Sequence, residues 1–256
     1  MKQTPTTPAS YRDVDVLIIG AGASGIPAAI AAARAGARVI LLEEDAMVGG
    51  AAVDQYVSMP DGGPRSGIVK ELVDRLSARF SLTPLPVDKW WEFWYLPTDY
   101  YRVVSDMLAA EPNIEVLCGV HATTVLVRDA SPRPVVEGVV ISTNDGEQRI
   151  TARVTIDATG TGEIAVRAGC RSMYGEDARN DFVEDLAPVE RTTTVQLCTW
   201  QYISQRMGDG PAFDLRRLQS SGVLESGYGW YANNQDGAVE RNSGTYLHWG
   251  CRIACP

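Results

Sequence analysis

Apolar residues form two different patterns in the N-terminal part of the chain. Val14 to Gly20 (VDVLIIG) is continuously apolar and β-branched, which is typical of a strand buried on both faces of a parallel sheet. Ser24 to Ala35 is rich in Ala and Ile and ends at Gly36, where a helix would stop. A second apolar run, ARVILLEE, follows. These patterns predict a β-α-β unit.

A glycine motif joins the first predicted strand to the helix. It reads Gly20-x-Gly22-x-x-Gly25, and Glu43 lies about 20 residues further on, at the tip of the second strand. Gly20 permits a tight turn, Gly22 lets the backbone approach a pyrophosphate, and Gly25 lets the helix pack against the strand. Glu43 is placed to accept hydrogen bonds from an adenosine ribose. A ligand-free glycine-rich turn is the alternative, but this arrangement favours dinucleotide binding.

Two amphipathic or capped segments follow the β-α-β unit. SGIVKELVDRLSARF is predicted to be an amphipathic helix, because one stripe carries Ile68, Leu72, Leu76 and Phe80. Further along, Thr98 is suited to cap a helix that runs to about Ala110. The amphipathic helix is expected to have a structural role.

The next part of the chain returns to strand patterns. NIEVLCGVHATTVLVRD is interpreted as a third parallel strand and its continuation. VVEGVVISTNDGEQRITARVTIDATG is interpreted as two strands joined by a hairpin turn at Asn144-Asp145-Gly146. The second of these strands runs through Gly160 and Gly162 into another helix, which predicts a second backbone contact with the ligand.

The regular succession of strand and helix patterns stops at Cys170, and this change sets the predicted domain limits. We expect a disordered tail over residues 1–12, a nucleotide-binding domain over 13–169 and part of a substrate domain over 170–256. The fold class is α/β: a Rossmann-like domain with a parallel sheet and a β-hairpin or meander insertion.

Composition excludes several classes of partner. The 256 residues include 23 Lys and Arg against 32 Asp and Glu, a net charge of -9, which lacks the basic footprint of a nucleic-acid or membrane binder. A small-molecule substrate is favoured. Five cysteines do not suggest a disulfide framework, and the polar N-terminus does not resemble a secretory signal, so we expect a cytoplasmic protein. The oligomeric state is left open.

The sequence offers little material for other catalytic chemistry. It has only two histidines, and Cys251-x-x-x-Cys255 lacks a second ligand pair at zinc-site spacing, so no metal site is expected. His248 is a conceivable proton donor, but a lone histidine does not define a catalytic site. The catalytic residues therefore stay unassigned.

Taken together, DVLIIGAGASGIPAAIAAARAGARVILLEE, the following VGG and the later IDATGTGEIAVRAG resemble the FAD-dependent oxidoreductases of the glutathione-reductase-like superfamily. The similar group has a second signature that reads Asp-Ala-Thr-Gly-x-Gly. The resemblance covers about residues 13–169. It implies FAD contacts as follows: pyrophosphate at Gly20, Gly22, Ser24 and Gly25; adenosine ribose at Glu43; ribityl or flavin side at Gly49 and Gly50; adenine at the Val120 backbone; and a border of the cofactor at Thr159 and Gly160.

The resemblance also implies a reaction and a cofactor state. We expect two-electron transfer between a small organic substrate and FAD. The alternatives are an NAD(P)-binding dehydrogenase and a non-catalytic nucleotide-binding fragment. Similar flavoproteins return to the FAD domain with a last glycine turn, which GCRIACP lacks, so a C-terminally truncated sequence is expected. The segment after Glu43 contains Tyr56 but no His or Cys, which predicts non-covalent FAD.

Overall fold

A computed structural model of the protein describes residues 10–57, 66–79, 95–144, 146–195, 198–205, 231–232 and 245–253. The chain divides into two compact units, Met1–Cys170 and Arg171–Pro256, each with its own sheet. The predicted domain limits stay predictions.

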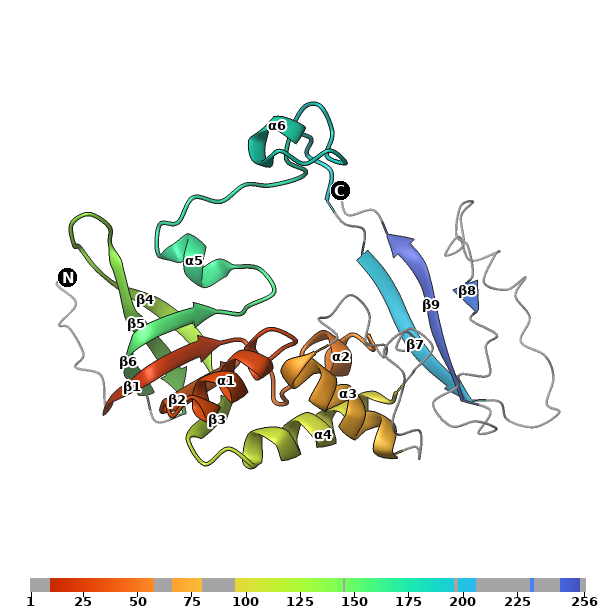
Figure 1. Cartoon of the computed structure of the whole chain (residues 1–256), viewed down its shortest axis with the longest axis horizontal. Coiled ribbons are helices and arrows are strands. Elements are labelled where there is room, and N and C mark those ends of the chain that lie inside the picture. Colours follow the sequence, from red (N-terminus) through yellow and green to blue (C-terminus); the bar gives the residue numbers. More distant parts are fainter. Residues whose placement is uncertain are drawn as a thin grey trace. The chain divides into compact units, whose positions relative to one another are not determined.

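Unit 1 is built on a six-stranded sheet of order β3-β2-β1-β6-β5-β4 (Figure 1). Its strands are β1 (Ser10–Ile19), β2 (Val39–Glu43), β3 (Ile114–Cys118), β4 (His121–Arg128), β5 (Val135–Thr143) and β6 (Gly146–Asp157). The strands β3, β2, β1 and β6 are parallel, whereas β5 and β4 extend the sheet in antiparallel pairs. The predicted Rossmann-like α/β fold with a meander is confirmed.

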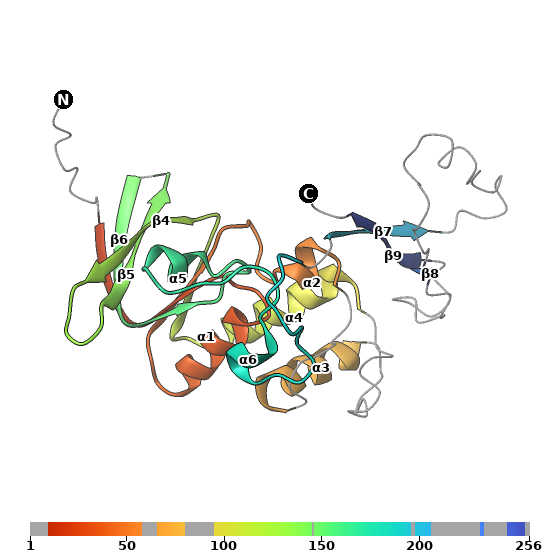
Figure 2. The ribbon, with the colours of Figure 1, turned by 90° about the horizontal axis from the view of Figure 1, so that it is seen from above.

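Helices cover the sheet on two sides, as Figure 1 and Figure 2 show. The helices of unit 1 are α1 (Gly25–Arg34), α2 (Ala51–Asp54), α3 (Gly67–Arg79), α4 (Pro97–Ala109) and α5 (Glu163–Arg167). Ile18 packs with α1, α3 and α4 in one buried cluster, whereas Leu17 and Ile19 pack with the meander and Ile164 of α5 in another. Side chains alternate across a strand, so β1 must be apolar at successive positions to fill both clusters.

The predicted amphipathic helix corresponds to α3. Leu76 is completely buried, and Ile68 and Leu72 are partly buried against the same cluster. Phe80 lies outside the described residues. The start of β1 differs from expectation, because Ser10 already pairs with Gln148 of β6.

Two local predictions were wrong. Leu96 occupies the N-cap position of α4, without a side-chain capping hydrogen bond, and Pro97 lies in the first turn, so Thr98 lies inside the helix and does not cap it. Proline is favoured there because its fixed φ suits a helix start and its missing N–H has no intrahelical partner to lose. The segment after Cys118 does not continue β3. Gly119 turns the chain at φ 70, and β4 lies at the opposite edge of the sheet.

Unit 2 contains a smaller antiparallel sheet of order β7-β9-β8. Its strands are β7 (Cys198–Gln205), β8 (Tyr231–Ala232) and β9 (Thr245–Ile253), and a short helix, α6 (Arg179–Phe182), precedes them. Among the described helices of both units, none combines the length and the apolar character that crossing a membrane requires.

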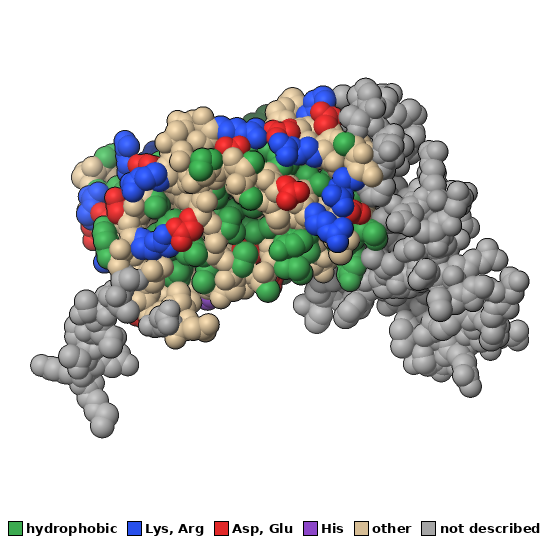
Figure 3. Space-filling model, turned by 90° about the horizontal axis from the view of Figure 1, so that it is seen from below, with side chains coloured by type: hydrophobic (Ala, Val, Ile, Leu, Met, Phe, Trp, Pro, Cys, Tyr) green, Lys and Arg blue, Asp and Glu red, His purple; other side chains and the backbone are tan. Residues whose placement is uncertain are grey.

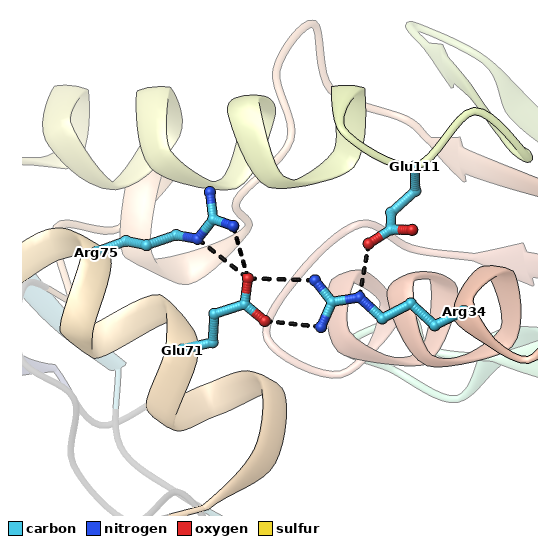
Figure 4. Close-up of polar contacts among 4 residues, drawn as sticks. All are labelled: Arg34, Glu71, Arg75 and Glu111. Atoms are coloured by element: carbon cyan, nitrogen blue, oxygen red, sulfur yellow. Dashed lines mark hydrogen bonds and ion pairs between the residues drawn. The ribbon is translucent and has the colours of Figure 1, made fainter.

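An ion-pair network fastens α1 to its neighbours in unit 1 (Figure 4). Arg34, in the last turn of α1, donates to Glu71 of α3 at 2.7 Å and to Glu111, after α4, at 2.6 Å. Arg75 donates to the same Glu71 carboxylate at 2.7 Å. Hydrogen bonds from Arg34 lower the pKa of Glu71, more strongly than partial burial raises it. On the face shown in Figure 3, basic and acidic side chains are interspersed.

Arg34→Met should lower the free energy of unfolding by about 1 kcal/mol, because one guanidinium joins two carboxylates on separate elements. Lys70→Met is the matched control, since the ion pair that the described residues give Lys70 lies within α3, with Asp74 four residues away. That variant should lose about 0.2 to 0.5 kcal/mol. Urea unfolding at low and high salt measures both values. If Arg34→Met lost no more unfolding free energy than Lys70→Met, Arg34 would not hold α1 against its neighbours.

Candidate cofactor site

The turns after β1 and β6 meet at the carboxyl end of the sheet. Gly20, directly after β1, donates its N–H to the carbonyl of Leu42 on β2 at 2.8 Å. On the other side, Ala158, directly after β6, donates to the carbonyl of Ile19 at 2.8 Å. The ends of β2, β1 and β6 therefore form one row, where ligands of open α/β sheets bind.

Glu43 is a buried acid at the end of β2, with 7% of its surface exposed. Its Oε2 atom accepts a hydrogen bond from the N–H of Ala21 at 2.7 Å, and Oε1 accepts one from Asp45 at 3.0 Å. These bonds hold the carboxylate against the first glycine turn. Each carboxylate oxygen can accept two hydrogen bonds, so Glu43 retains capacity for hydroxyl donors.

The segment after β3 is attached to the same strand end. Gly119 donates to the Asp45 carbonyl at 2.9 Å, and Val120 donates to the Glu43 carbonyl at 3.0 Å. The amide of Val120 is thus engaged within the protein, and a backbone contact to a ligand would come from its carbonyl. Cys118 is exposed and lies opposite Glu43 in the β2–β3 register. Partial burial and the Glu43 charge raise the pKa of the Cys118 thiol.

The Gly49-Gly50 pair lies against the first glycine turn. Gly49 donates its N–H to the Ala21 carbonyl at 2.8 Å, and Gly50 caps α2. A Cβ atom on Gly50 would stand 2.9 Å from the Cα of Gly22. The two glycine segments therefore approach each other backbone to backbone.

Asp157 organises the second glycine turn, a role that the sequence analysis did not identify. Its Oδ1 accepts from the amide and the hydroxyl of Thr159, at 3.0 and 2.6 Å, and its Oδ2 accepts from the amide of Ala165 in α5 at 2.8 Å. Burial acts to raise the pKa of Asp157, but the hydrogen bonds from Thr159 and the α5 amides outweigh it and lower the pKa. In the sequence, this role could have been recognised from an acidic residue at the end of a strand, directly before a glycine turn.

Protein packing explains four of the predicted site glycines. A Cβ atom on Gly20 would lie 2.5 Å from the Ala158 carbonyl oxygen, and one on Gly25 would collide with the carbonyl oxygen of Gly20. Gly49 and Gly50 both have positive φ, at 132° and 52°, where side chains other than glycine are strained. These residues must be glycine for the fold itself.

Gly22 and Gly160 have no such internal explanation. The φ of each lies outside the left-handed region. Among the described residues, a Cβ atom on Gly22 would meet only the Cα of Gly50, at an ordinary 3.8 Å, and one on Gly160 would have nothing within 4 Å. Both positions border the row of strand ends. Glycine there leaves space that the described part of the chain does not fill.

The remaining predicted residue at the first turn, Ser24, is the N-cap residue of α1, but its side chain makes no capping hydrogen bond. In the first turn of α1, the Ile26 amide donates to the Gly22 carbonyl at 3.1 Å, the Ala28 amide donates to the Ser24 carbonyl at 3.2 Å, and Pro27 has no N–H. The positive end of the α1 dipole is still a favourable environment for an anion beside this turn. Within the described part of the chain, no group of three His, Cys, Asp or Glu side chains converges as a metal site requires.

The sequence of this chain matches the family described as FAD dependent oxidoreductase over residues 15–248. The chain belongs to this family of flavoproteins, and the cofactor of the family is FAD.

Named relatives match a short part of the chain. The sarcosine oxidase α subunit of Corynebacterium sp. (strain P-1) is 38% identical over 86 residues, which are 32% of this chain and 9% of that protein. The α subunit from Rhizobium meliloti (strain 1021) is 39% identical over 67 residues, 26% of this chain and 7% of the relative. This chain thus spans less than a tenth of the length of the relatives it matches.

Two solved structures are similar to this chain to different extents. The anhydrotetracycline hydroxylase OxyS from Streptomyces rimosus superposes with a TM-score of 0.50 at 15% identity, over 94% of this chain and 45% of that one. THI4 from Thermovibrio ammonificans gives a TM-score of 0.45 at 21% identity, over 70% of this chain and 76% of that chain.

Alanine variants of Gly25 and Gly22 should distinguish a glycine that packing requires from one that leaves space for a ligand. Gly25→Ala should destabilise the ligand-free protein by about 3 kcal/mol or more, because its Cβ would collide with the Gly20 carbonyl. Gly22→Ala should change stability by about 0.5 kcal/mol or less. Denaturant unfolding of both apoproteins checks this difference. Equal destabilisation would show that Gly22 is required by packing.

Proposed function

We propose that this chain binds FAD across the carboxyl ends of β2, β1 and β6, and that the bound flavin exchanges two electrons with a small organic substrate. The observation that carries the proposal is the space beside Gly22. Packing requires Gly20 and Gly25, but Gly22 has room for a side chain within the protein. A pyrophosphate needs that room, because it must approach the backbone at the helix N-terminus.

In this proposal, each part of FAD meets a different strand end. The ribose hydroxyls donate to Glu43 at the end of β2, and adenine contacts the Val120 backbone beside it. The pyrophosphate lies over Gly22, where the positive end of the α1 dipole favours negative charge. The other half of FAD then extends past Gly50 and toward Gly160, after β6. The order of the strands supports this path, since β1 lies between β2 and β6.

The chain's own residues bind and orient the cofactor. FAD, when bound, supplies the two-electron chemistry. Glu43 fixes the adenosine end through a carboxylate that is itself held by Ala21 and Asp45. Family membership and the second signature at Asp157 favour FAD over a nicotinamide cofactor, which would use the same first glycine motif. The sarcosine oxidase subunits among the relatives are consistent with an oxidoreductase role for this chain.

Gly22→Val should abolish FAD binding while the fold survives, because a branched side chain would occupy the pyrophosphate space. Ala31→Val is the matched control: Ala31 is an exposed residue of the same helix, away from its N-terminus. Equilibrium titration with FAD and circular dichroism of both variants make the comparison. If Gly22→Val lost secondary structure together with FAD binding, the glycine would be structural and the proposal would fail.

Glu43→Ala should weaken binding of FAD and of ADP by about 10- to 100-fold, since hydrogen bonds to a charged group contribute about 1.5 to 3 kcal/mol. The affinities for FAD and ADP should fall by the same factor, because both ligands contain the adenosine ribose. Glu44→Ala and the double variant are the controls, and Glu44→Ala alone should have little effect. Unchanged FAD affinity in Glu43→Ala, with no further loss in the double variant, would remove Glu43 from the site.

FAD should be held without a covalent bond. The segment EDAMVGGAAVDQYVSMP after Glu43 has no His or Cys, and Tyr56 is the one candidate it leaves for covalent attachment. Acid precipitation of the loaded protein should therefore release all the flavin into the supernatant. Flavin fluorescence that stays with the pellet in the wild type and disappears in Tyr56→Phe would contradict this and identify the attachment site.

A further inference from the structure

The short helix α5 is attached to the second glycine turn at its beginning. A single carboxylate, Asp157, accepts hydrogen bonds from Thr159 in the turn and from the Ala165 amide in the helix. The hydroxyl of Thr159 donates to the same Oδ1 atom. The backbone conformation of the turn is therefore fixed to the helix through Asp157.

At its other end, α5 is attached to the segment that follows Val120. Arg167, the last residue of the helix, donates from Nη1 to the carbonyl oxygen of Ala122 at 2.8 Å. Its Nη2 donates to Glu163, one turn back on the helix, at 3.2 Å. Ala122 is 4% exposed and lies near the start of β4. A charged donor on a backbone carbonyl there fixes the position of this segment.

Between its attachments to the Thr159 turn and to Ala122, α5 packs its buried side against residues at the ends of β1 and β2. Ile164 is 2% exposed and belongs to the same buried cluster as Ile19, the last residue of β1, and Leu42, the residue before the end of β2. Val120 packs against this cluster as well. The helix therefore bridges the turn after β6 and the segment beside β2, with the row of strand ends between them.

We propose that Asp157 and Arg167 are positioning residues for FAD: through α5 they hold the turn at Thr159 and the Val120 segment in a fixed relative position, so that one dinucleotide can contact both. This inference rests on the proposed function. Neither residue needs to touch the cofactor. Their effect arises because two contact segments bind a long ligand together only when their separation fits it.

The mechanism predicts a difference between the whole cofactor and its adenosine half. FAD must reach both segments at once, whereas ADP contacts only Glu43, the first glycine turn and the Val120 segment. Loosening α5 should therefore weaken FAD binding by on the order of tenfold, and ADP binding by less than about threefold. Loss of folding would weaken both ligands by the same factor.

The test compares FAD and ADP dissociation constants, by calorimetry, for the full chain and four variants. Asp157→Asn places an amide N–H₂ where the Ala165 amide needs an acceptor, and Arg167→Met removes the bond to Ala122. Arg167→Lys keeps a charged donor and should recover part of the FAD affinity. Glu163→Gln is the matched control, because it removes only the exposed ion pair to Arg167. Hydrogen exchange at the Thr159 and Ala165 amides reports the loosening without any ligand.

We expect Asp157→Asn and Arg167→Met to lose FAD affinity selectively, with Glu163→Gln similar to the wild type and faster exchange in Asp157→Asn. Equal losses of FAD and ADP, or unchanged FAD affinity in both variants, would overturn the positioning role. A wild-type chain that binds ADP but not FAD would overturn the proposed function, and this inference with it.

Discussion

The close approach of three backbone segments at the end of β1 is the constraint on which the site depends. Gly20 lies against the carbonyl of Ala158, and Gly25 lies against the carbonyl of Gly20. Any side chain at these positions would push α1 away from the sheet or separate β1 from the turn after β6. Because the backbones are this close, the α1 N-terminus, the Glu43 carboxylate and the second glycine turn lie within one row of strand ends. The ion pairs of Arg34 then hold the far end of α1 against α3 and the segment after α4.

Much of this arrangement could be predicted from the sequence, because the signals are local. The continuous apolar runs of β1 and β2 report burial on two faces, and the glycine spacing reports a tight turn followed by a helix. The hairpin between β5 and β6 follows from its turn residues. The sequence could not distinguish which glycines the fold needs, because that depends on the distance from each Cα to atoms far along the chain. Gly20 and Gly22 are two residues apart, yet only Gly20 faces the Ala158 carbonyl.

The features missed by sequence reasoning are tertiary. Asp157 stands in the second signature, but its bond to Ala165 becomes visible only once α5 is placed. Arg167 and Ala122 are 45 residues apart, and no periodicity connects them. The wrong cap at Thr98 has a different cause, since the preference of threonine for helix caps is weaker there than the preference of Pro97 for the first turn. The continuation of β3 was misread because Gly119 turns the chain between two apolar runs.

Site-resolved alkylation of Cys118, followed by mass spectrometry, tests the central claim most directly. Cys118 is exposed beside Glu43, where the adenosine end of FAD should cover it, and exposed Cys170 serves as the internal control. The raised pKa of the Cys118 thiol calls for an alkaline reaction buffer. With FAD or ADP at about 100 times its dissociation constant, about 1% of sites stay free, so alkylation of Cys118 should slow by up to about 100-fold while that of Cys170 is unchanged. Equal alkylation rates of Cys118 with and without saturating FAD would contradict this account.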